Sequence, residues 1–261
     1  MIQIKINKPY PKQLEFYRSK HRYTAYGGAR GGGKSDVARS KAILLCLQYA
    51  GIQILFMRRT YPEIKENHLI PASKILNGVA RYSGMDKAFV FPNGSRLKFG
   101  YCRNDSDLLQ YQGQAYDVIF LEECTQFPEN VFLTMTESNR SSGIMEDYFP
   151  PRMYFTCNPG GVGHAWFKRL FIDRDFRPKE NPEDYFFIQA GVYDNPWLIR
   201  NSPDYIRALE NLPEQRKQAM LYGNWDVFEG QFFPEFQPKT HVCKPFKIPE
   251  HWKRYRVFDY G

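Results

Sequence analysis

Cysteine and histidine are scarce in this 261-residue sequence, and neither type is clustered. The five cysteines are odd in number and are never spaced as Cys-x-x-Cys, so neither a disulfide framework nor a zinc site is indicated. Long apolar runs are also missing. Residues 42–47 and 118–121 are far too short to cross a bilayer, and the first five residues lack the apolar core of a signal peptide. We therefore expect a soluble protein of a cytoplasm.

Positive charge is concentrated near the N-terminus. The net charge is +8, yet residues 1–65 alone carry thirteen Lys or Arg against three Asp or Glu. Such an excess favours an anionic partner, for example DNA, although a solvated basic face explains the same composition equally well. With 43% hydrophobic residues, the chain can form one α/β domain, with or without a small appendage.

The most specific pattern is the phosphate-binding loop sequence G-x-x-x-x-G-K-[ST], known as Walker A. It is matched by Gly28-Ala29-Arg30-Gly31-Gly32-Gly33-Lys34-Ser35. In such a loop the backbone N–H groups surround phosphates, the lysine reaches the outer phosphates, and the serine hydroxyl binds Mg²⁺. A flexible glycine linker is the alternative, but a β-prone segment at 22–26 and helical spacing over 37–47 argue for strand, loop and helix.

Further apolar segments predict the rest of the sheet. Residues 52–57 and 152–157 are expected strands, and residues 89–91 and 96–101 should form a hairpin around Asn93-Gly94. Residues 117–121 are a continuous apolar run, which is typical of a strand covered on both faces. A helix is expected over 72–82. The predicted fold is α/β, with a mostly parallel, doubly wound sheet flanked by helices.

Two adjacent acids, Glu122 and Glu123, follow the apolar strand and resemble a Walker B element. Nucleotide hydrolysis needs an acidic group near the loop to hold Mg²⁺ and to polarise water. We assign Glu122 to the magnesium shell, directly or through water, and Glu123 to the attacking water. By themselves two adjacent acids are more often a helix N-terminal pair favoured by the helix dipole. The phosphate loop about ninety residues earlier favours the catalytic interpretation.

Other candidate residues are less specific. Arg30 could reach the γ-phosphate in the transition state or merely pair with Glu123 in the resting state. Gln13 has both a donor and an acceptor for the edge of adenine, but a lone glutamine usually faces solvent. Thr156 and Asn158 lie at the end of another strand and could sense the γ-phosphate. From the residues alone, an Asn-Pro turn with a strand-capping threonine is the better explanation.

The order of these elements resembles that of the large terminase subunit of tailed bacteriophages. That family combines a RecA-like ATPase domain, which pumps double-stranded DNA through a portal into a capsid, with an RNase H-like nuclease. The segments that carry the resemblance are Pro11-Lys12-Gln13, Tyr26–Ser35, Phe56-Met57-Arg58-Arg59-Thr60, Gln112-Gly113, Val118–Glu123, Asn158-Pro159-Gly160-Gly161, Asp194-Asn195-Pro196 and Tyr222-Gly223-Asn224-Trp225.

The resemblance implies a role for each candidate. Gln13 and the loop would bind ATP, Lys34 and Arg30 would assist catalysis, and Glu123 would be the catalytic carboxylate. Ser35 and Glu122 would hold Mg²⁺, and the strand end would couple hydrolysis to movement. The coupling segment is Thr156-Cys157-Asn158.

The same resemblance implies the domains and partners. We expect an ATPase domain over 1–225, a linker over 226–254, and the first strand of a truncated nuclease over 255–261, with Asp259 as a nuclease metal ligand in an intact chain. Cleavage with two metals needs several carboxylates, so no nuclease activity is expected here. The expected partners are duplex DNA, the portal, the small terminase subunit and further copies in a ring, a pentamer on the procapsid, although the chain in isolation could be a monomer. The expected location is the host cytoplasm.

One position departs from the family pattern. Some relatives carry an arginine before the glycine that precedes the acidic strand, whereas Gln112 stands here. This favours Arg30 acting in cis over an arginine finger acting in trans. Two other functions fit the loop: a helicase-like motor on single strands, and a nucleotide-dependent assembly switch.

Overall fold

The computed structural model describes residues 4, 6–143, 149–227 and 238–258. Contacts divide the chain into a unit of residues 1–230 and a unit of residues 231–261. In the second unit the described residues contain α10 (Pro238–His241), and residues 255–258 do not form the expected strand. Asp259 lies outside the described residues. None of the helices that the structure describes is long and apolar enough to cross a membrane.

The first unit is built around an eight-stranded sheet in the order β3-β4-β5-β2-β6-β7-β1-β8. The strands from β5 to β8 in this order are parallel, and β4 and β3 extend the sheet antiparallel. This arrangement confirms the predicted mostly parallel sheet and the hairpin. The strands are β1 (Tyr23–Gly28), β2 (Gln53–Arg58), β3 (Arg81–Ser83), β4 (Ala88–Val90), β5 (Arg96–Tyr101), β6 (Val118–Leu121), β7 (Arg152–Cys157) and β8 (Tyr185–Ala190).

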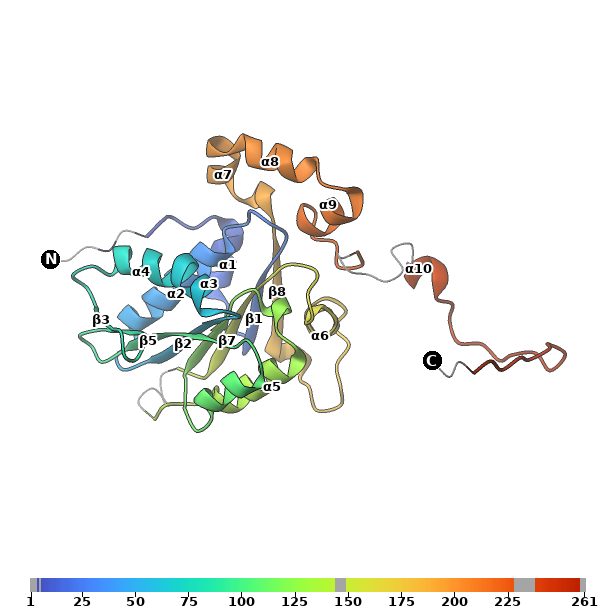
Figure 1. The fold of residues 1–261 in the computed structure, drawn as a ribbon, viewed down its shortest axis with the longest axis horizontal. Coiled ribbons are helices and arrows are strands. Elements are labelled where there is room, and N and C mark those ends of the chain that lie inside the picture. Colours follow the sequence, from blue (N-terminus) through green and yellow to red (C-terminus); the bar gives the residue numbers. More distant parts are fainter. Residues whose placement is uncertain (1–3, 5, 144–148, 228–237, 259–261) are drawn as a thin grey trace. The chain divides into compact units, whose positions relative to one another are not determined.

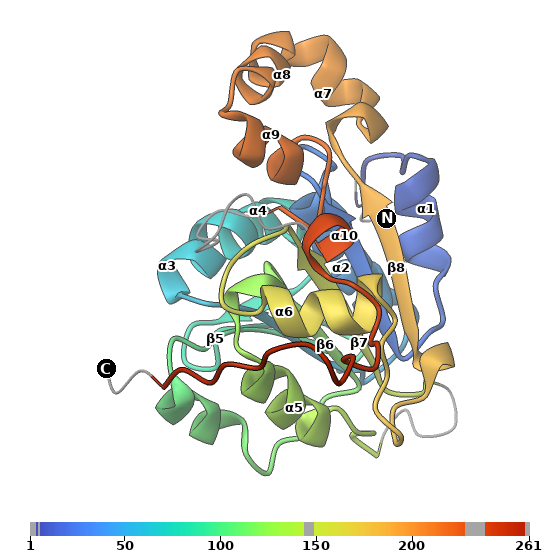
Figure 2. The same ribbon diagram turned by 90° about the vertical axis from the view of Figure 1, so that its right-hand side faces the viewer.

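Helices cover both faces of this sheet (Figures 1 and 2). Side chains alternate between the faces along each strand, so Ile54 and Phe56 of β2 pack in one core and Leu55 and Met57 in the other. Burial on both faces explains why these strands are continuous apolar runs. The helices are α1 (Pro11–Arg18), α2 (Lys34–Gln48), α3 (Tyr61–Ile64), α4 (Ile70–Ile75), α5 (Glu129–Ser138), α6 (His164–Phe167), α7 (Pro196–Asn201), α8 (Pro203–Glu210) and α9 (Glu214–Met220).

Shorter helical turns link these elements. Among them, η1 (Lys65–Leu69) is a π-helical turn that joins α3 to α4 without a break. The helix expected over 72–82 ends earlier, at Ile75, because Gly78 takes a left-handed φ of +73° and residues 81–83 pair as β3. The other helical turns are η2 (Asp105–Tyr111), η3 (Cys124–Gln126), η4 (Lys168–Ile172), η5 (Pro182–Asp184) and η6 (Val192–Asp194).

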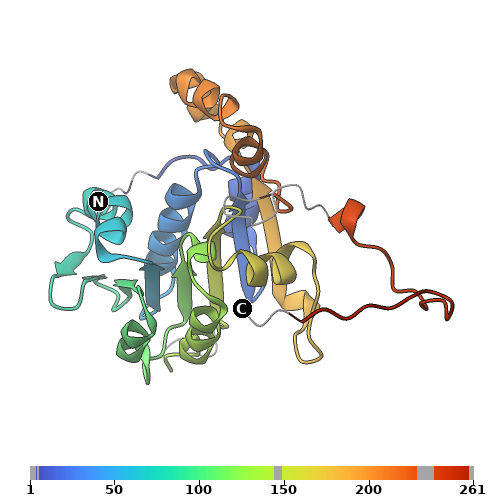
Figure 3. The same ribbon diagram turned by 45° about the vertical axis from the view of Figure 1, so that its right-hand side comes forward.

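The strand order places three chemically important segments at one edge. β7 lies between β1, which leads into the glycine loop, and β6, which ends at the two acids. Because these strands are parallel, their carboxyl ends meet at the same edge of the sheet. The helices α7, α8 and α9 lie beyond that edge (Figure 3).

Candidate nucleotide site

The glycine loop has the backbone conformation of a phosphate cradle. Gly28, Gly31 and Gly33 take φ values of +97°, +81° and +74°, which L side chains rarely adopt. α2 begins at Lys34, so its first unpaired N–H groups face the space that the loop encloses. This geometry suits a polyphosphate.

Contacts from three other segments fix the loop. The Tyr26 hydroxyl donates to the carbonyl of Gly32 at 3.0 Å, and Asn195 Nδ2 donates to the carbonyl of Gly31 at 2.8 Å. The N–H of Arg30 donates to the carbonyl of Met220 at 2.7 Å. The last two contacts tie the loop to the segment that begins α7 and to the end of α9.

A chain of hydrogen bonds joins the loop lysine to the second acid. Lys34 Nζ donates to Asn158 Oδ1 at 2.8 Å and to the carbonyl of Ala29 at 2.7 Å. Asn158 Nδ2 in turn donates to Glu123 Oε2 at 2.9 Å and Oε1 at 3.2 Å. The three side chains predicted for phosphate binding, sensing and water activation therefore lie in direct contact.

Glu123 has an unusual backbone that aims its side chain into this chain of contacts. Its φ and ψ of 51° and 50° are left-handed, a conformation that is strained for a non-glycine residue and is concentrated at functional sites. The Thr156 hydroxyl accepts the Glu123 N–H at 2.9 Å, and the Thr125 hydroxyl donates to the Asn158 carbonyl at 2.9 Å. The ends of β6 and β7 are thus held to each other.

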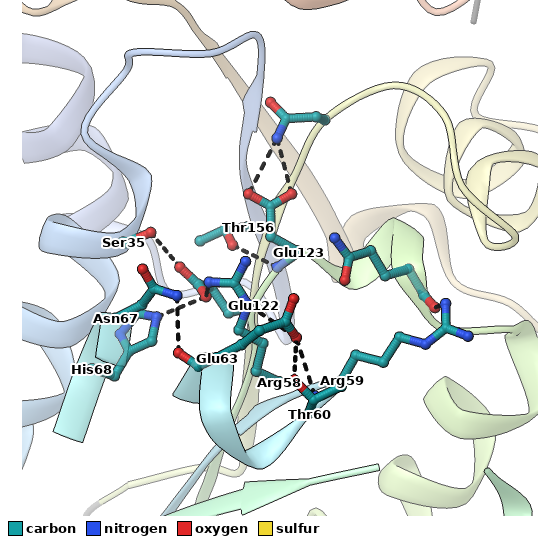
Figure 4. Close-up of polar contacts among 12 residues, drawn as sticks. Ser35, Arg58, Arg59, Thr60, Glu63, Asn67, His68, Glu122, Glu123 and Thr156 are labelled. Atoms are coloured by element: carbon teal, nitrogen blue, oxygen red, sulfur yellow. Dashed lines mark hydrogen bonds and ion pairs between the residues drawn. The ribbon is translucent and has the colours of Figure 1, made fainter. Parts of the chain in front are cut away.

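Glu122 is enclosed by three polar partners (Figure 4). Its Oε1 accepts the hydroxyl of Ser35, and its Oε2 accepts Arg58 at 2.8 Å. Nε2 of His68 lies 2.7 Å from the same Oε2, with the imidazole turned away from ideal alignment. The side chains of Glu122 and His68 are both completely buried.

These partners decide the charge of Glu122. Burial by itself would raise the pKa of this carboxyl, but the contacts with His68, Arg58 and Ser35 outweigh it and lower the pKa to about 2. Burial lowers the pKa of His68. The lowered pKa of each group favours an ionised Glu122 beside a neutral imidazole. Of the two tautomers of that imidazole, the one with its proton on Nε2 could donate to the carboxylate.

A cavity of about 400 Å³ opens between the loop, Glu123 and Asn158. Arg30 is exposed and also lines it. In the described part of the chain, the Glu123 carboxylate accepts hydrogen bonds from Asn158 and not from Arg30. The ion pair between Arg30 and Glu123, which the sequence left open as a resting state, is therefore not present there. A larger cavity of about 720 Å³ lies at the opposite edge of the sheet, far from the glycine loop. The residues that line the 400 Å³ cavity beside the loop are Arg30–Asp36, Arg58, Glu123, Gln126, Asn158 and Tyr205.

Gln13 lies beside the loop although it belongs to α1. It is buried, its Oε1 accepts the N–H of Tyr10 at 3.0 Å, and its Nε2 would be only 2.7 Å from a Cβ at Gly33. It therefore adjoins the loop instead of facing solvent.

The Cys157 side chain packs in the hydrophobic core that also contains Leu55 and Met57. This residue therefore contributes its backbone, and not its side chain, to the edge of the sheet where the loop lies.

The residues at this edge fit a bound Mg²⁺. Among the described residues no three His, Cys, Asp or Glu side chains gather into a metal cluster. Magnesium beside a nucleotide needs no such cluster, because phosphate and water oxygens complete the octahedron around one or two protein ligands. The contacting hydroxyl of Ser35 and carboxylate of Glu122 supply hard oxygen ligands of this kind.

Sequence reasoning gave no role to three residues of the site. Arg58 and His68 hold Glu122, and Asn195 holds the loop. The signal for Arg58 was its position at the end of a parallel strand, where polar side chains gather. His68 carried no such signal, because a lone histidine in a helix is usually structural.

The chain is similar to large terminases of bacteriophages. A family model described as phage terminase large subunit matches residues 20–223, and no curated protein matches. The large terminase of a thermophilic bacteriophage superposes with a TM-score of 0.67 at 18% identity, covering 93% of this chain and 60% of that one. The complex of the same terminase with ADP gives 0.68 at 18%, covering 92% and 59%. The Thermus phage P74-26 large terminase ATPase domain gives 0.59 at 12%, covering 84% and 94%.

These comparisons agree with the fold. The identities are low, so the structural similarities show a shared fold. The chain spans about 60% of the large terminase from the thermophilic bacteriophage. Because the family model matches most of the sequence, the chain belongs to the phage terminase large subunit family.

Proposed function

We propose that this chain is a magnesium-dependent ATPase motor domain that moves double-stranded viral DNA into a procapsid. The observation that carries the proposal is the continuous contact from Lys34 through Asn158 to Glu123 within one cavity. It joins a phosphate-binding cation to an acid that can take a proton from water. Similar folds have been solved as complexes with ADP and with ATP-γ-S.

Each residue of the site has a distinct chemical task. The loop N–H groups and Lys34 bind the β- and γ-phosphates, and Glu123 orients and deprotonates the attacking water. Ser35 and Glu122 would hold Mg²⁺. When bound, the metal neutralises charge on the β- and γ-phosphate oxygens. Gln13, which lies beside Gly33, would contact adenine.

Arg30 acts in cis in this proposal. Its exposed side chain lines the cavity, and it makes no side-chain hydrogen bond or ion pair with the part of the chain that the structure describes. A guanidinium that reaches the γ-phosphate would stabilise charge in the transition state. Gln112, where some relatives have arginine, follows η2 and is exposed, and it is absent from the lining of the cavity.

Asn158 and Thr156 are the proposed coupling residues, with Cys157 supplying the backbone between them. Lys34 already donates to Ala29 and Asn158, so a γ-phosphate that it binds would share the same ammonium with Asn158. Loss of phosphate therefore alters the contacts of Glu123, and it alters the loop that Asn195 and Met220 connect to the α7–α9 region.

We extend the proposal to the wider assembly, with membership of the terminase family as its support. We propose an ATPase domain over 1–225, a linker over 226–254 and the start of a nuclease over 255–261, where Asp259 would bind metal in an intact chain. The partners would be the portal, the small terminase subunit and other copies in a pentameric ring, in the host cytoplasm. DNA contacts would be mainly to phosphates, since a packaging motor must accept any sequence.

The test is the ATPase rate of the chain alone, with duplex DNA, and with portal added. Stimulation by both supports a packaging motor, whereas stimulation by single strands alone would favour a helicase-like motor. Slow hydrolysis that neither addition changes would favour an assembly switch. Two variants check the site: Lys34→Ala should lose tight nucleotide binding, and Glu123→Gln should bind ATP yet fail to hydrolyse it. Wild-type turnover in Glu123→Gln would overturn the assignment.

A further inference from the structure

We propose that His68 is a positioning residue for the magnesium site: its Nε2–H holds Oε2 of Glu122, so that Oε1 stays directed at Ser35. The inference rests on the proposed function, because it assumes that Ser35 and Glu122 share a bound Mg²⁺. It adds a residue that neither the loop nor the acidic strand contains.

The contacts divide the two oxygens of Glu122 between different tasks. Oε2 receives Arg58 at 2.8 Å and lies 2.7 Å from His68 Nε2, whereas Oε1 meets only the Ser35 hydroxyl among the contacts described (Figure 4). The hydrogen bond from Arg58 and the close approach of His68 Nε2, both at one oxygen, oppose rotation of the carboxylate about its last bond. The oxygen that faces the loop is then fixed in place before a metal arrives, as hydrogen bonds to a ligand commonly achieve.

A purely structural role explains His68 poorly. The ring is fully buried against Phe56, with centroids 4.4 Å apart. Neither ring nitrogen has an aligned hydrogen bond among the described residues, and Nε2 is the one that lies within 2.7 Å of a polar group, the Glu122 carboxylate. An aliphatic side chain would fill this position without leaving a buried nitrogen unpaired, which is unfavourable. What an aliphatic side chain could not do is donate to Glu122.

The helix that carries His68 contains a π-helical turn at this residue. Ile64, His68 and Ala72 are four residues apart and buried, so they form the inner face of one helix that runs from α3 through η1 to α4. His68 lies in the π-helical turn, a wider turn that is often found at functional sites.

The turn is also tied to the helix that begins at the phosphate loop. Arg39 of α2 donates to the carbonyl of Asn67 at 3.0 Å and pairs with Asp36 at 2.6 Å. Asp36 directly follows Ser35. The imidazole and the hydroxyl that meet at Glu122 are therefore held by elements that contact each other.

Three variants separate donation from packing. In glutamine the amide nitrogen is three bonds from Cβ, like histidine Nε2, whereas in asparagine it is two bonds away, like Nδ1. His68→Gln should therefore keep the contact with Glu122, and His68→Asn should lose it. Asn67→Ala, which removes an exposed neighbouring side chain, is the matched control.

We expect His68→Asn to lower kcat by about 10- to 100-fold and to raise the Mg²⁺ concentration for half-maximal rate about tenfold, with a smaller change in KM for ATP. His68→Gln and Asn67→Ala should stay within about threefold of wild type. Calorimetry gives a second readout: the gain in ADP affinity on adding Mg²⁺ should shrink in His68→Asn only. In ¹⁵N-histidine NMR of the nucleotide-free wild type, His68 should be the Nε2–H tautomer.

Several results would overturn the positioning role. These are an Nδ1–H tautomer in the wild type, an unchanged Mg²⁺ response in folded His68→Asn, or equal losses in the Gln and Asn variants. If His68→Asn does not fold, the tautomer and the Gln variant still decide. A wild-type chain without hydrolysis, but with Mg²⁺-dependent ADP binding that His68→Asn loses, would reject the proposed motor and support the positioning role.

Discussion

Replacing Asn158 with alanine removes the contact between the loop and Glu123, the proposed catalytic acid. Asn158 accepts from Lys34 at 2.8 Å and donates to Glu123 at 2.9 and 3.2 Å, so both partners are charged. Hydrogen bonds to charged groups contribute about 1.5–3 kcal/mol each. Lys34 keeps its bond to Ala29, and water can reach Glu123 through the cavity, so only part of this energy is lost. We expect the activation barrier to rise by about 2–3 kcal/mol, or roughly 30- to 150-fold in kcat.

The assay is steady-state phosphate release by Asn158→Ala, with thermal unfolding to confirm that the variant is folded. ATP binding should change less than kcat, because the loop and Lys34 remain. Thr125→Val is the control. It removes the hydrogen bond from Thr125 to the Asn158 carbonyl and leaves the hydrogen bonds from Lys34 through Asn158 to Glu123 intact. Wild-type kcat in Asn158→Ala, or an equal loss in the control, would refute the idea that the Asn158 side chain transmits between loop and acid.

Two further predictions concern stability. Burial lowers the pKa of Lys41 to about 7. Between pH 7 and 8.5 the unfolded chain therefore binds more protons at this residue than the folded chain does, and the free energy of unfolding should rise with pH. Relative to Lys41→Met, we expect a rise of up to about 1.4 kcal/mol per pH unit. Denaturant titrations across this range measure the difference, and parallel pH profiles would contradict it. Gly27→Ala should lower the free energy of unfolding by about 3 kcal/mol, because φ is +147° and the new Cβ would lie 2.3 Å from the Cys157 carbonyl oxygen. Gly78→Ala, with a φ of +73° and nothing within 4 Å, should lose only about 1 kcal/mol, and equal losses would show that crowding at Gly27 is unimportant.

Local sequence patterns were enough to predict the main parts of the sheet. A continuous apolar run such as Val118–Leu121 requires burial on both faces, and the structure buries all four residues. Parallel strands gather their carboxyl ends, so the residues after β6 and β7 had to lie near the loop once those strands were assigned. The proximity of Glu123 and Asn158 therefore followed from strand assignment alone.

Contacts that depend on tertiary packing could not be predicted in this way. His68 is separated from Glu122 by more than fifty residues, and only the packing of α3, η1 and α4 against the sheet brings it there. The predicted C-terminal boundary of the helix over 72–82 was wrong for a related reason. Its apolar residues fit a helical period, but strand pairing at 81–83 and a left-handed Gly78 decided the boundary.

The position of β7 explains why Lys34 and Glu123 are joined through the Asn158 side chain and not by a direct contact. Neighbouring strands are about 4.8 Å apart, so β1 and β6, on either side of β7, are separated by roughly 10 Å. Lys34 and Glu123 follow these outer strands, and Asn158, which follows the middle one, contacts both. An amide can accept from an ammonium and donate to a carboxylate at the same time, which no single charged side chain can do. A γ-phosphate that draws Lys34 away from Asn158 would free the accepting half of this side chain and leave the donating half on Glu123. In the proposed cycle one neutral side chain would therefore respond to the nucleotide while it contacts the proposed catalytic acid.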